Sequence, residues 1–203
     1  MARRTKAEAA ATREALIDAA EEMFMEHGVA RTSLEQIARH AGMTRGAVYW
    51  HFKNKADLFH AMLDRVHLPF QYLFDEVDSA IADSCPLEAI RQACIKGFAR
   101  AELPRNKRVH FILMYRCEFF SDIDPQAMQE EISGDISQVL LKYFQLAAER
   151  QQLTTLSPEA AADLFHATLS GLFYAWLRHP ERYSLEARGT IMIEDLLSLL
   201  RSG

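Results

Sequence analysis

Residues 32–55 read TSLEQIARHAGMTRGAVYWHFKNK, and the local organisation of the chain is clearest in this stretch. Thr32 and Glu35 match the T-x-x-E pattern of a capping box, which predicts the start of a helix. Apolar residues then recur at helical spacing as far as Ala41. The following Gly42 can adopt the positive φ that a sharp turn requires. We therefore expect a short helix that ends in a tight turn.

A second short helix is predicted to follow this turn. Thr44 can cap it, and it is expected over residues 45–52. Two short helices joined by a glycine-containing turn form a helix-turn-helix, whose second helix enters the major groove of DNA. Arg45, at the start of the second helix, can pair with guanine. The alternative is an αα-hairpin in an ordinary helical protein, with Tyr49 and Trp50 simply half-buried.

Other side chains on the second helix suit contacts with the DNA backbone. Tyr49, His51 and Lys55 can donate to phosphates, which fix register without reading sequence. Val48 and Phe52 are expected to face the core instead. The pattern therefore favours DNA binding over the plain hairpin.

The run from about Thr12 to Leu58 resembles the N-terminal domain of the TetR family of one-component repressors. The residues that carry the resemblance are Ala20, Phe24, Gly28, Thr32, Ile37, Ala38, Ala41, Gly42, Gly46, Tyr49, His51, Phe52, Lys55 and Leu58. The segment TRGAVYWHFKNKADLF, over 44–59, resembles the AcrR-like subgroup, which represses multidrug efflux pumps. The resemblance implies that Arg45 reads bases and that its polar neighbours contact phosphates. The DNA-contacting residues are predicted as Thr32, Ser33, Thr44, Arg45, Gly46, Ala47, Tyr49, Trp50, His51 and Lys55.

Composition predicts an all-α protein. The chain has 203 residues, 49% of them hydrophobic, with few glycines and prolines and no persistent strand-like alternation. No apolar run is long enough for a transmembrane helix, and the N-terminus lacks the apolar core of a signal peptide. A cytoplasmic protein with no membrane partner is therefore expected.

Charge is distributed unevenly along the chain. The net charge is −5, yet residues 1–55 hold nine Lys and Arg against seven Asp and Glu, a local excess of +2. Attraction to DNA depends on the local distribution rather than on the total. The basic excess therefore coincides with the predicted DNA-binding segment.

The chain is predicted to contain two domains: a helix-turn-helix domain over 1–55 and a helical ligand-binding and dimerisation domain over 56–203. Asn54 can cap a helix from residue 55 to about residue 82, with a bend near Pro69. Such a helix would join the two domains as one rigid element, so the boundary would lie inside it.

Five further helices are expected, near 86–103, 107–120, 125–152, 158–179 and 185–200. The last two are apolar on more than one face, which predicts a two-fold interface of four helices from two chains. The alternative is a larger core within one chain. The homodimer interface is predicted to use Leu164, Thr168, Leu172, Trp176, Ile193, Leu197 and Leu200.

The second domain is rich in Phe, Met and Tyr, which are typical of a packed core and also of an adaptable apolar cavity. The cavity itself rests on the family resemblance, which implies a small hydrophobic effector. Its lining is predicted as His67, Phe70, Phe74, Phe98, Phe111, Met114, Cys117 and Phe144.

No pattern in the sequence points to catalysis. Nucleophile-elbow, P-loop and zinc-protease motifs are absent, and the three cysteines are scattered without zinc spacing. We expect no enzyme, no cofactor and no metal. Together with the family resemblance, the sequence predicts a homodimeric repressor that binds a palindromic, double-stranded operator and leaves it when a small hydrophobic compound binds. The resemblance implies control of a multidrug efflux pump, and the alternative is a TetR-type regulator of another pathway, such as lipid or aromatic-compound metabolism.

Overall fold

The computed structural model describes residues 6–66, 81, 84–119, 123–153 and 156–201, with the backbone alone at 131–133. The chain divides into two compact units. Unit 1 comprises 1–67 and 108–128, and unit 2 comprises 68–107 and 129–203. The described residues are mostly helical, with no strand longer than isolated bridge residues such as the pair Leu153 and Arg201, so the all-α prediction is confirmed. The functional boundary after residue 55 stays a prediction.

Unit 1 is built on α1 (Lys6–His27), which buries a stripe of apolar side chains. Leu16, Ala20 and Phe24 are fully buried at a spacing of four residues, as helical periodicity predicts. Phe24 packs against Phe59, with ring centroids 6.1 Å apart. Gly28 ends the helix at φ +83°, a left-handed conformation that glycine adopts without steric cost.

The helix α2 (Leu34–His40) begins one residue later than the predicted capping box implied. Ser33 is the N-cap, and its hydroxyl accepts from the Gln36 N–H while the Gln36 side chain accepts from the Ser33 N–H. Thr32 is buried, and its hydroxyl donates to the Gly28 carbonyl at 2.8 Å. The predicted pairing of Thr32 with Glu35 was wrong because the loop already uses the Thr32 hydroxyl.

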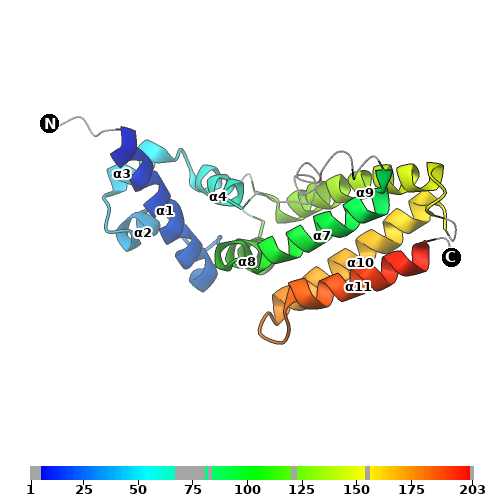
Figure 1. Ribbon diagram of the computed structural model, residues 1–203. Coiled ribbons are helices and arrows are strands. Elements are labelled where there is room, and N and C mark those ends of the chain that lie inside the picture. The colour runs from blue at the N-terminus through cyan, green and yellow to red at the C-terminus, as the bar shows by residue number, and fades with distance from the viewer. Residues whose placement is uncertain (1–5, 67–80, 82–83, 120–122, 154–155, 202–203) are drawn as a thin grey trace. The chain divides into compact units, whose positions relative to one another are not determined.

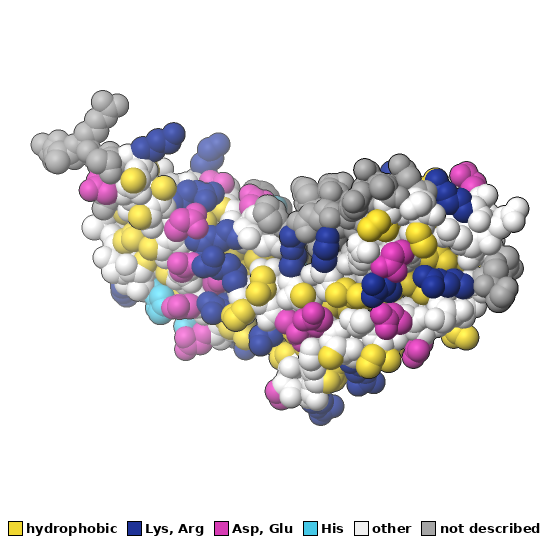
Figure 2. Space-filling model, in the orientation of Figure 1, with side chains coloured by type: hydrophobic (Ala, Val, Ile, Leu, Met, Phe, Trp, Pro, Cys, Tyr) yellow, Lys and Arg dark blue, Asp and Glu magenta, His cyan; other side chains and the backbone are white. Residues whose placement is uncertain are grey.

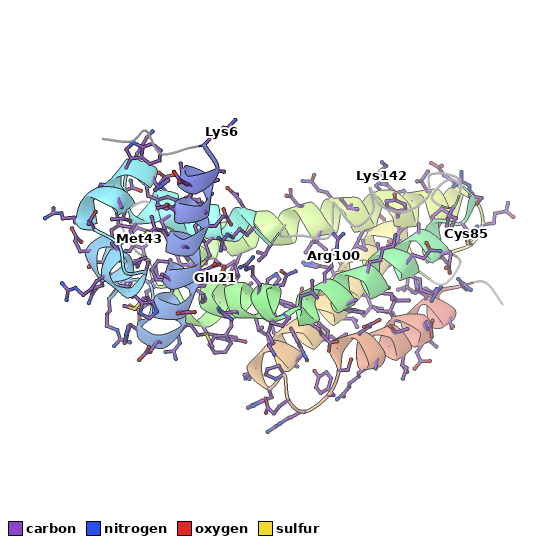
Figure 3. The ribbon with its side chains drawn as sticks, turned by 60° about the vertical axis from the view of Figure 1, so that its left-hand side comes forward. Lys6, Glu21, Met43, Cys85, Arg100 and Lys142 are labelled. Carbon is purple, nitrogen blue, oxygen red and sulfur yellow. The ribbon has the colours of Figure 1, made fainter. Side chains whose placement is uncertain are left out.

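The turn after α2 and the helix α3 (Arg45–His51) form as predicted. Gly42 has φ +67°, and Met43, labelled in Figure 3, donates its N–H to the Ala38 carbonyl at 2.8 Å. The Thr44 hydroxyl accepts from the Ala47 N–H and caps α3. On the inner side of this region Val48 is fully buried, and so is the next residue after α3, Phe52.

The helix α4 (Lys55–Asp64) has the predicted Asn54 N-cap but is much shorter than expected. It closes on Arg65, whose N–H donates to the Met62 carbonyl at 3.4 Å. A proline removes the helical hydrogen bond to the carbonyl four residues earlier, so the sequence itself disfavours one regular helix through position 69. The prediction of one helix from 55 to 82 was therefore wrong. The stretch around Pro69 itself lies outside the described residues.

The segment predicted as one helix over 107–120 has a different course. It starts earlier, with α8 (Pro104–Phe111), and continues as a wider π-helix, η1 (Ile112–Arg116). It then stops, and residues 117–119 are not helical. The Arg116 carbonyl accepts from the Val29 N–H at 2.9 Å, so the end of η1 is bonded to the loop after α1.

Unit 2 contains α7 (Pro86–Glu102), most of α9 (Pro125–Glu149), α10 (Pro158–Arg178) and α11 (Leu185–Leu200). These helices run alongside one another, and α11 packs on α7 (Figure 1). Gly189 permits this contact, because a Cβ there would lie 2.6 Å from the Phe98 ring. The predicted starts of these two helices near residues 158 and 185 are confirmed, and Ser157 and Ser184 cap them.

None of the helices in the described ranges is long and apolar enough to cross a membrane.

Candidate nucleic-acid interface

The helix α3 presents most of its side chains to solvent. It buries only Val48, so the remaining positions are available for contact. The Arg45 side chain is 75% exposed and Trp50 is 71% exposed. A single exposed apolar side chain is ordinary, but here two exposed aromatic residues, Tyr49 and Trp50, lie beside the exposed Arg45 on one short helix. The face of α3 therefore has the character of a binding surface.

The predicted DNA-contacting residues fall into three groups by exposure. Those fully on the surface are Thr44, Arg45, Gly46, Tyr49 and Trp50, and those half-buried are Ser33, Ala47 and His51. Thr32 and Lys55 are buried. The structure thus brings eight of the predicted residues to the surface around α3 and places two inside.

Arg45, Tyr49 and Glu35 form a cluster on this surface. The Tyr49 hydroxyl donates to Glu35 Oε1 at 2.8 Å, and Arg45 Nε lies 3.3 Å from the same oxygen. The Arg45 guanidinium also lies over the Tyr49 ring, 5.5 Å from its centroid. The hydrogen bond from Tyr49 is the main cause that lowers the pKa of Glu35, and in return it raises the pKa of Tyr49. Sequence reasoning missed Glu35 as a member of this site.

Lys55 does not reach the surface to contact a phosphate as predicted, because its ammonium is bonded inside unit 1. Its ammonium donates to the carbonyls of Val29 at 2.6 Å, Ala30 at 3.1 Å and Thr32 at 2.8 Å. Those three bonds use all three N–H donors of a lysine. Burial lowers the pKa of Lys55. The Lys55 ammonium therefore holds the loop between α1 and α2 against the start of α4, and the predicted phosphate contact is corrected.

Thr32 requires the same correction. Its side chain is 1% exposed, and its hydroxyl is bonded within the loop, so it has no surface to offer a phosphate. The sequence signal was ambiguous, because Thr32 and Ser33 both fit the pattern of a helix cap.

A buried ionic cluster fixes α1 against the rest of unit 1. Glu21 is 1% exposed, and its carboxylate lies 3.1 Å from Arg65 and 3.6 Å from Arg108. Arg65 also bonds Asp18 at 2.7 Å and the carbonyl of Glu14 at 2.7 Å. Figure 3 labels Glu21 on α1, and Figure 2 shows basic and acidic side chains interleaved on the face of unit 1 that it draws. The cluster joins three segments that are distant in sequence, so no local pattern could predict it.

Most of the predicted dimer residues belong to the core of one chain. Leu172, Trp176, Ile193, Leu197 and Leu200 are all at most 5% exposed, so they have almost no surface to bury against a partner. The prediction that these five residues face a partner chain is therefore corrected, because packing within the chain already buries them. Leu164 is exposed and Thr168 is half-buried. Exposed apolar side chains that the prediction missed are Tyr174, Ile191, Met192 and Leu199.

The predicted ligand-binding residues are divided between the units. Phe98 and Phe144 are buried in unit 2, where Phe144 packs on Phe165 with centroids 5.6 Å apart. Phe111, Met114 and Cys117 are half-buried in unit 1, and burial raises the pKa of Cys117 to about 11. His67, Phe70 and Phe74 lie outside the described residues. The cavity lining therefore stays a prediction.

Known protein families match both parts of the chain. Residues 16–62 match the bacterial regulatory proteins of the tetR family, and residues 85–202 match the C-terminal region of MAATS-type transcriptional repressors. The second match alone covers more than half of the chain. The chain belongs to the TetR family. Its fold class and its helix-turn-helix domain are thereby established, and its family consists of transcriptional regulators rather than enzymes.

Individual TetR-family proteins are similar to it over their full length. The transcriptional regulator TtgR of Pseudomonas putida is 37% identical, with 99% of this chain and 97% of TtgR covered. A second relative is NalD, the secondary repressor of the MexAB-OprM multidrug efflux pump in Pseudomonas aeruginosa. Its sequence is 36% identical, and its crystal structure superposes with a TM-score of 0.81, covering 97% of this chain and 98% of the NalD chain. The complex of Stenotrophomonas maltophilia SmeT with triclosan is 34% identical, with coverage of 95% and 92% and a TM-score of 0.77.

Replacing Lys55 tests its structural position. Lys55→Met keeps an apolar stem and removes the ammonium, which leaves three carbonyl oxygens without their donor. We expect a loss of about 1–3 kcal/mol in the free energy of unfolding, the usual cost of an unsatisfied buried polar group. Urea denaturation followed by circular dichroism measures it.

The matched control is Lys53→Met, two residues earlier, because Lys53 is exposed. It should change stability by less than about 0.5 kcal/mol. If the two variants were equally stable, the three carbonyl bonds would contribute nothing net, and the structural role given to Lys55 would be rejected.

Proposed function

We propose that this protein is a dimeric transcriptional repressor that binds a palindromic operator through α3 and leaves it when a small hydrophobic compound binds. The genes it controls would include those of a multidrug efflux pump. The observation that carries the proposal is the exposed face of α3, where Arg45, Tyr49 and Trp50 stand out from a rigid three-helix core. A recognition helix must be held in place by the core of its domain, while the side chains that read bases must project from that core into solvent.

The chemistry of the α3 face supports DNA as the partner. Arg45 lies at the first position of α3, and the N-terminal residues of a recognition helix reach base edges. Gly46 is exposed and has only the Thr44 hydroxyl near its Cβ position, at 3.9 Å, so the backbone can come close to the groove. The exposed Thr44 supplies a hydroxyl at the margin that can donate to a phosphate. The face therefore offers both the reading and the positioning contacts that a DNA complex needs.

The relatives support the efflux and effector parts of the proposal. NalD represses a multidrug efflux pump, and SmeT, which represses the SmeDEF multidrug efflux pump, has been seen in complex with triclosan. This chain is similar to both along nearly its whole length, including the second domain that would hold the effector. We infer the same type of control and the same broad class of effector.

A homodimer would cover the apolar side chains that α10 and α11 leave exposed. Leu164 and Tyr174 lie on α10, and Ile191, Met192 and Leu199 lie on α11, where Ile191 is 61% and Leu199 is 73% exposed. These side chains, and not the buried members of the same helices, are the proposed interface. A two-fold dimer would present two α3 helices to the two halves of a palindrome.

The reading role of Arg45 has a direct test. Arg45→Ala should weaken binding to the preferred operator by about 1–3 kcal/mol and relax the preference at one base, because a bidentate pair with guanine is lost. The preferred operator is obtained by selection from a random duplex pool, and affinities are measured by fluorescence anisotropy for it and for single-base variants. Arg39→Ala on α2 removes another exposed charge and should weaken all sequences alike. If Arg45→Ala also weakened all sequences alike, Arg45 would not read a base.

The dimer interface has a separate test. Ile191→Glu should give a monomer, because the interface would bury an unpaired carboxylate. Light scattering at micromolar concentration measures the mass. Leu103→Glu is the matched control, since Leu103 is exposed in unit 2 but lies outside α10 and α11 and should leave the dimer intact. Unmodified protein that ran as a monomer would contradict the proposed assembly.

A further inference from the structure

The helix-turn-helix contains one acidic residue. Between Thr32 and Lys55 the sequence has four basic residues, Arg39, Arg45, Lys53 and Lys55, and a single carboxylate, that of Glu35. DNA phosphates repel a carboxylate, so its presence on a surface that binds DNA weakens the general attraction. Its position in the first turn of α2 suits the helix dipole, which accounts for an acid there but not for where its side chain reaches.

The carboxylate of Glu35 reaches across to α3 and engages the two residues best placed to contact DNA. One oxygen, Oε1, accepts the hydrogen bond from Tyr49 at 2.8 Å and lies 3.3 Å from Arg45 Nε. Arg45 and Tyr49 also contact each other, through the guanidinium over the ring at 5.5 Å. Three interactions therefore hold these side chains in one arrangement before any DNA arrives.

We propose that Glu35 is a specificity-determining residue of the DNA-reading surface, acting by holding Arg45 ready for a base edge and by penalising complexes in which only phosphates are contacted. The inference rests on the proposed function, and it assigns Glu35 a role through Arg45 rather than a base contact of its own.

The two effects of Glu35 differ between operator and nonspecific DNA. Repulsion between the carboxylate and phosphates weakens both complexes. The prearranged Arg45 strengthens only the operator complex, since only there does the guanidinium meet a guanine edge in a fixed geometry. Glu35 thus lowers nonspecific affinity more than operator affinity, and the ratio of the two affinities rises.

The decisive variant is Glu35→Gln, which removes the charge and keeps an oxygen that can accept from Tyr49. Its affinity for a scrambled duplex should rise about 2–5-fold, the size expected from loss of an exposed ionic interaction. Its affinity for the selected operator should rise less, so the ratio of operator to scrambled affinity should fall. The probes are a 30-bp duplex selected by the unmodified protein from a random pool and its scrambled counterpart, each measured over a series of salt concentrations.

Two controls separate this role from a general effect of charge. Glu26→Gln removes one exposed carboxylate from α1, away from α3, and should leave the affinity ratio unchanged. In the Arg45→Ala background, Glu35→Gln should also leave the ratio unchanged, because the residue through which it acts is gone.

Three results would overturn the inference. Glu35→Gln could raise the affinities for the operator and for the scrambled duplex by the same factor, or it could change neither affinity. Its effect on the ratio of operator to scrambled affinity could also persist in the Arg45→Ala background. Failure of the proposed function would look different, because the unmodified protein would then enrich no sequence from the random pool.

Discussion

The buried ammonium of Lys55 is the interaction on which the N-terminal helices depend. A charge inside a protein is costly unless its donors are all satisfied, and here three carbonyls from the loop between α1 and α2 satisfy them. The loop must therefore keep one conformation, with its carbonyls turned toward α4. Val29 adds a second restraint, since its N–H is bonded to the Arg116 carbonyl. Because α2 starts directly after this loop, the same bonds set where α2 and α3 lie.

The Glu21 cluster restrains unit 1 in a second place. The chain leaves unit 1 just after Arg65 and re-enters it at Arg108, and both arginines contact the one carboxylate of Glu21 on α1. Glu21 and Arg65 are largely buried, so removing either one would leave the charge of the other buried without its partner, which is strongly destabilising. Arg65, just before the chain enters unit 2, and Arg108, where it returns, are thus both paired with α1, which packs against α2 and α3.

Sequence reasoning succeeded where the governing chemistry is local. Asn54, Ser157 and Ser184 cap helices where predicted, and α7, α9 and α10 all begin at prolines, whose fixed φ and missing N–H suit a first turn. The exposed face of α3 followed from the same local pattern, since only Val48 of that helix turns inward. Capping and periodicity act within one or two helical turns, so they can be recognised from neighbouring residues.

The failures share the opposite cause. A lysine at the start of a helix looks like a phosphate ligand, and nothing near Lys55 in sequence reveals carbonyls 23–26 residues away. Leu172 and Ile193 look like interface because their helices are apolar all round, yet packing within the chain buries them and leaves Ile191 outside. Glu35 was overlooked because its role depends on reaching Tyr49, 14 residues later on another helix. Its sequence signal, a lone acid in a basic segment, was present.

The proposed function requires this protein to bind a two-fold symmetric DNA site and to dissociate from it when a hydrophobic compound binds. Sequencing the fragments of host DNA that the immobilised protein retains, with and without hydrophobic cations and planar aromatic compounds, tests it most directly. We expect a few fragments that share a two-fold symmetric sequence, with half-sites about one helical turn (~34 Å) or a multiple of it apart, near genes for an efflux pump. At least one compound should release them. Equal retention of all fragments, or a symmetric site that no compound of either class releases, would contradict the account.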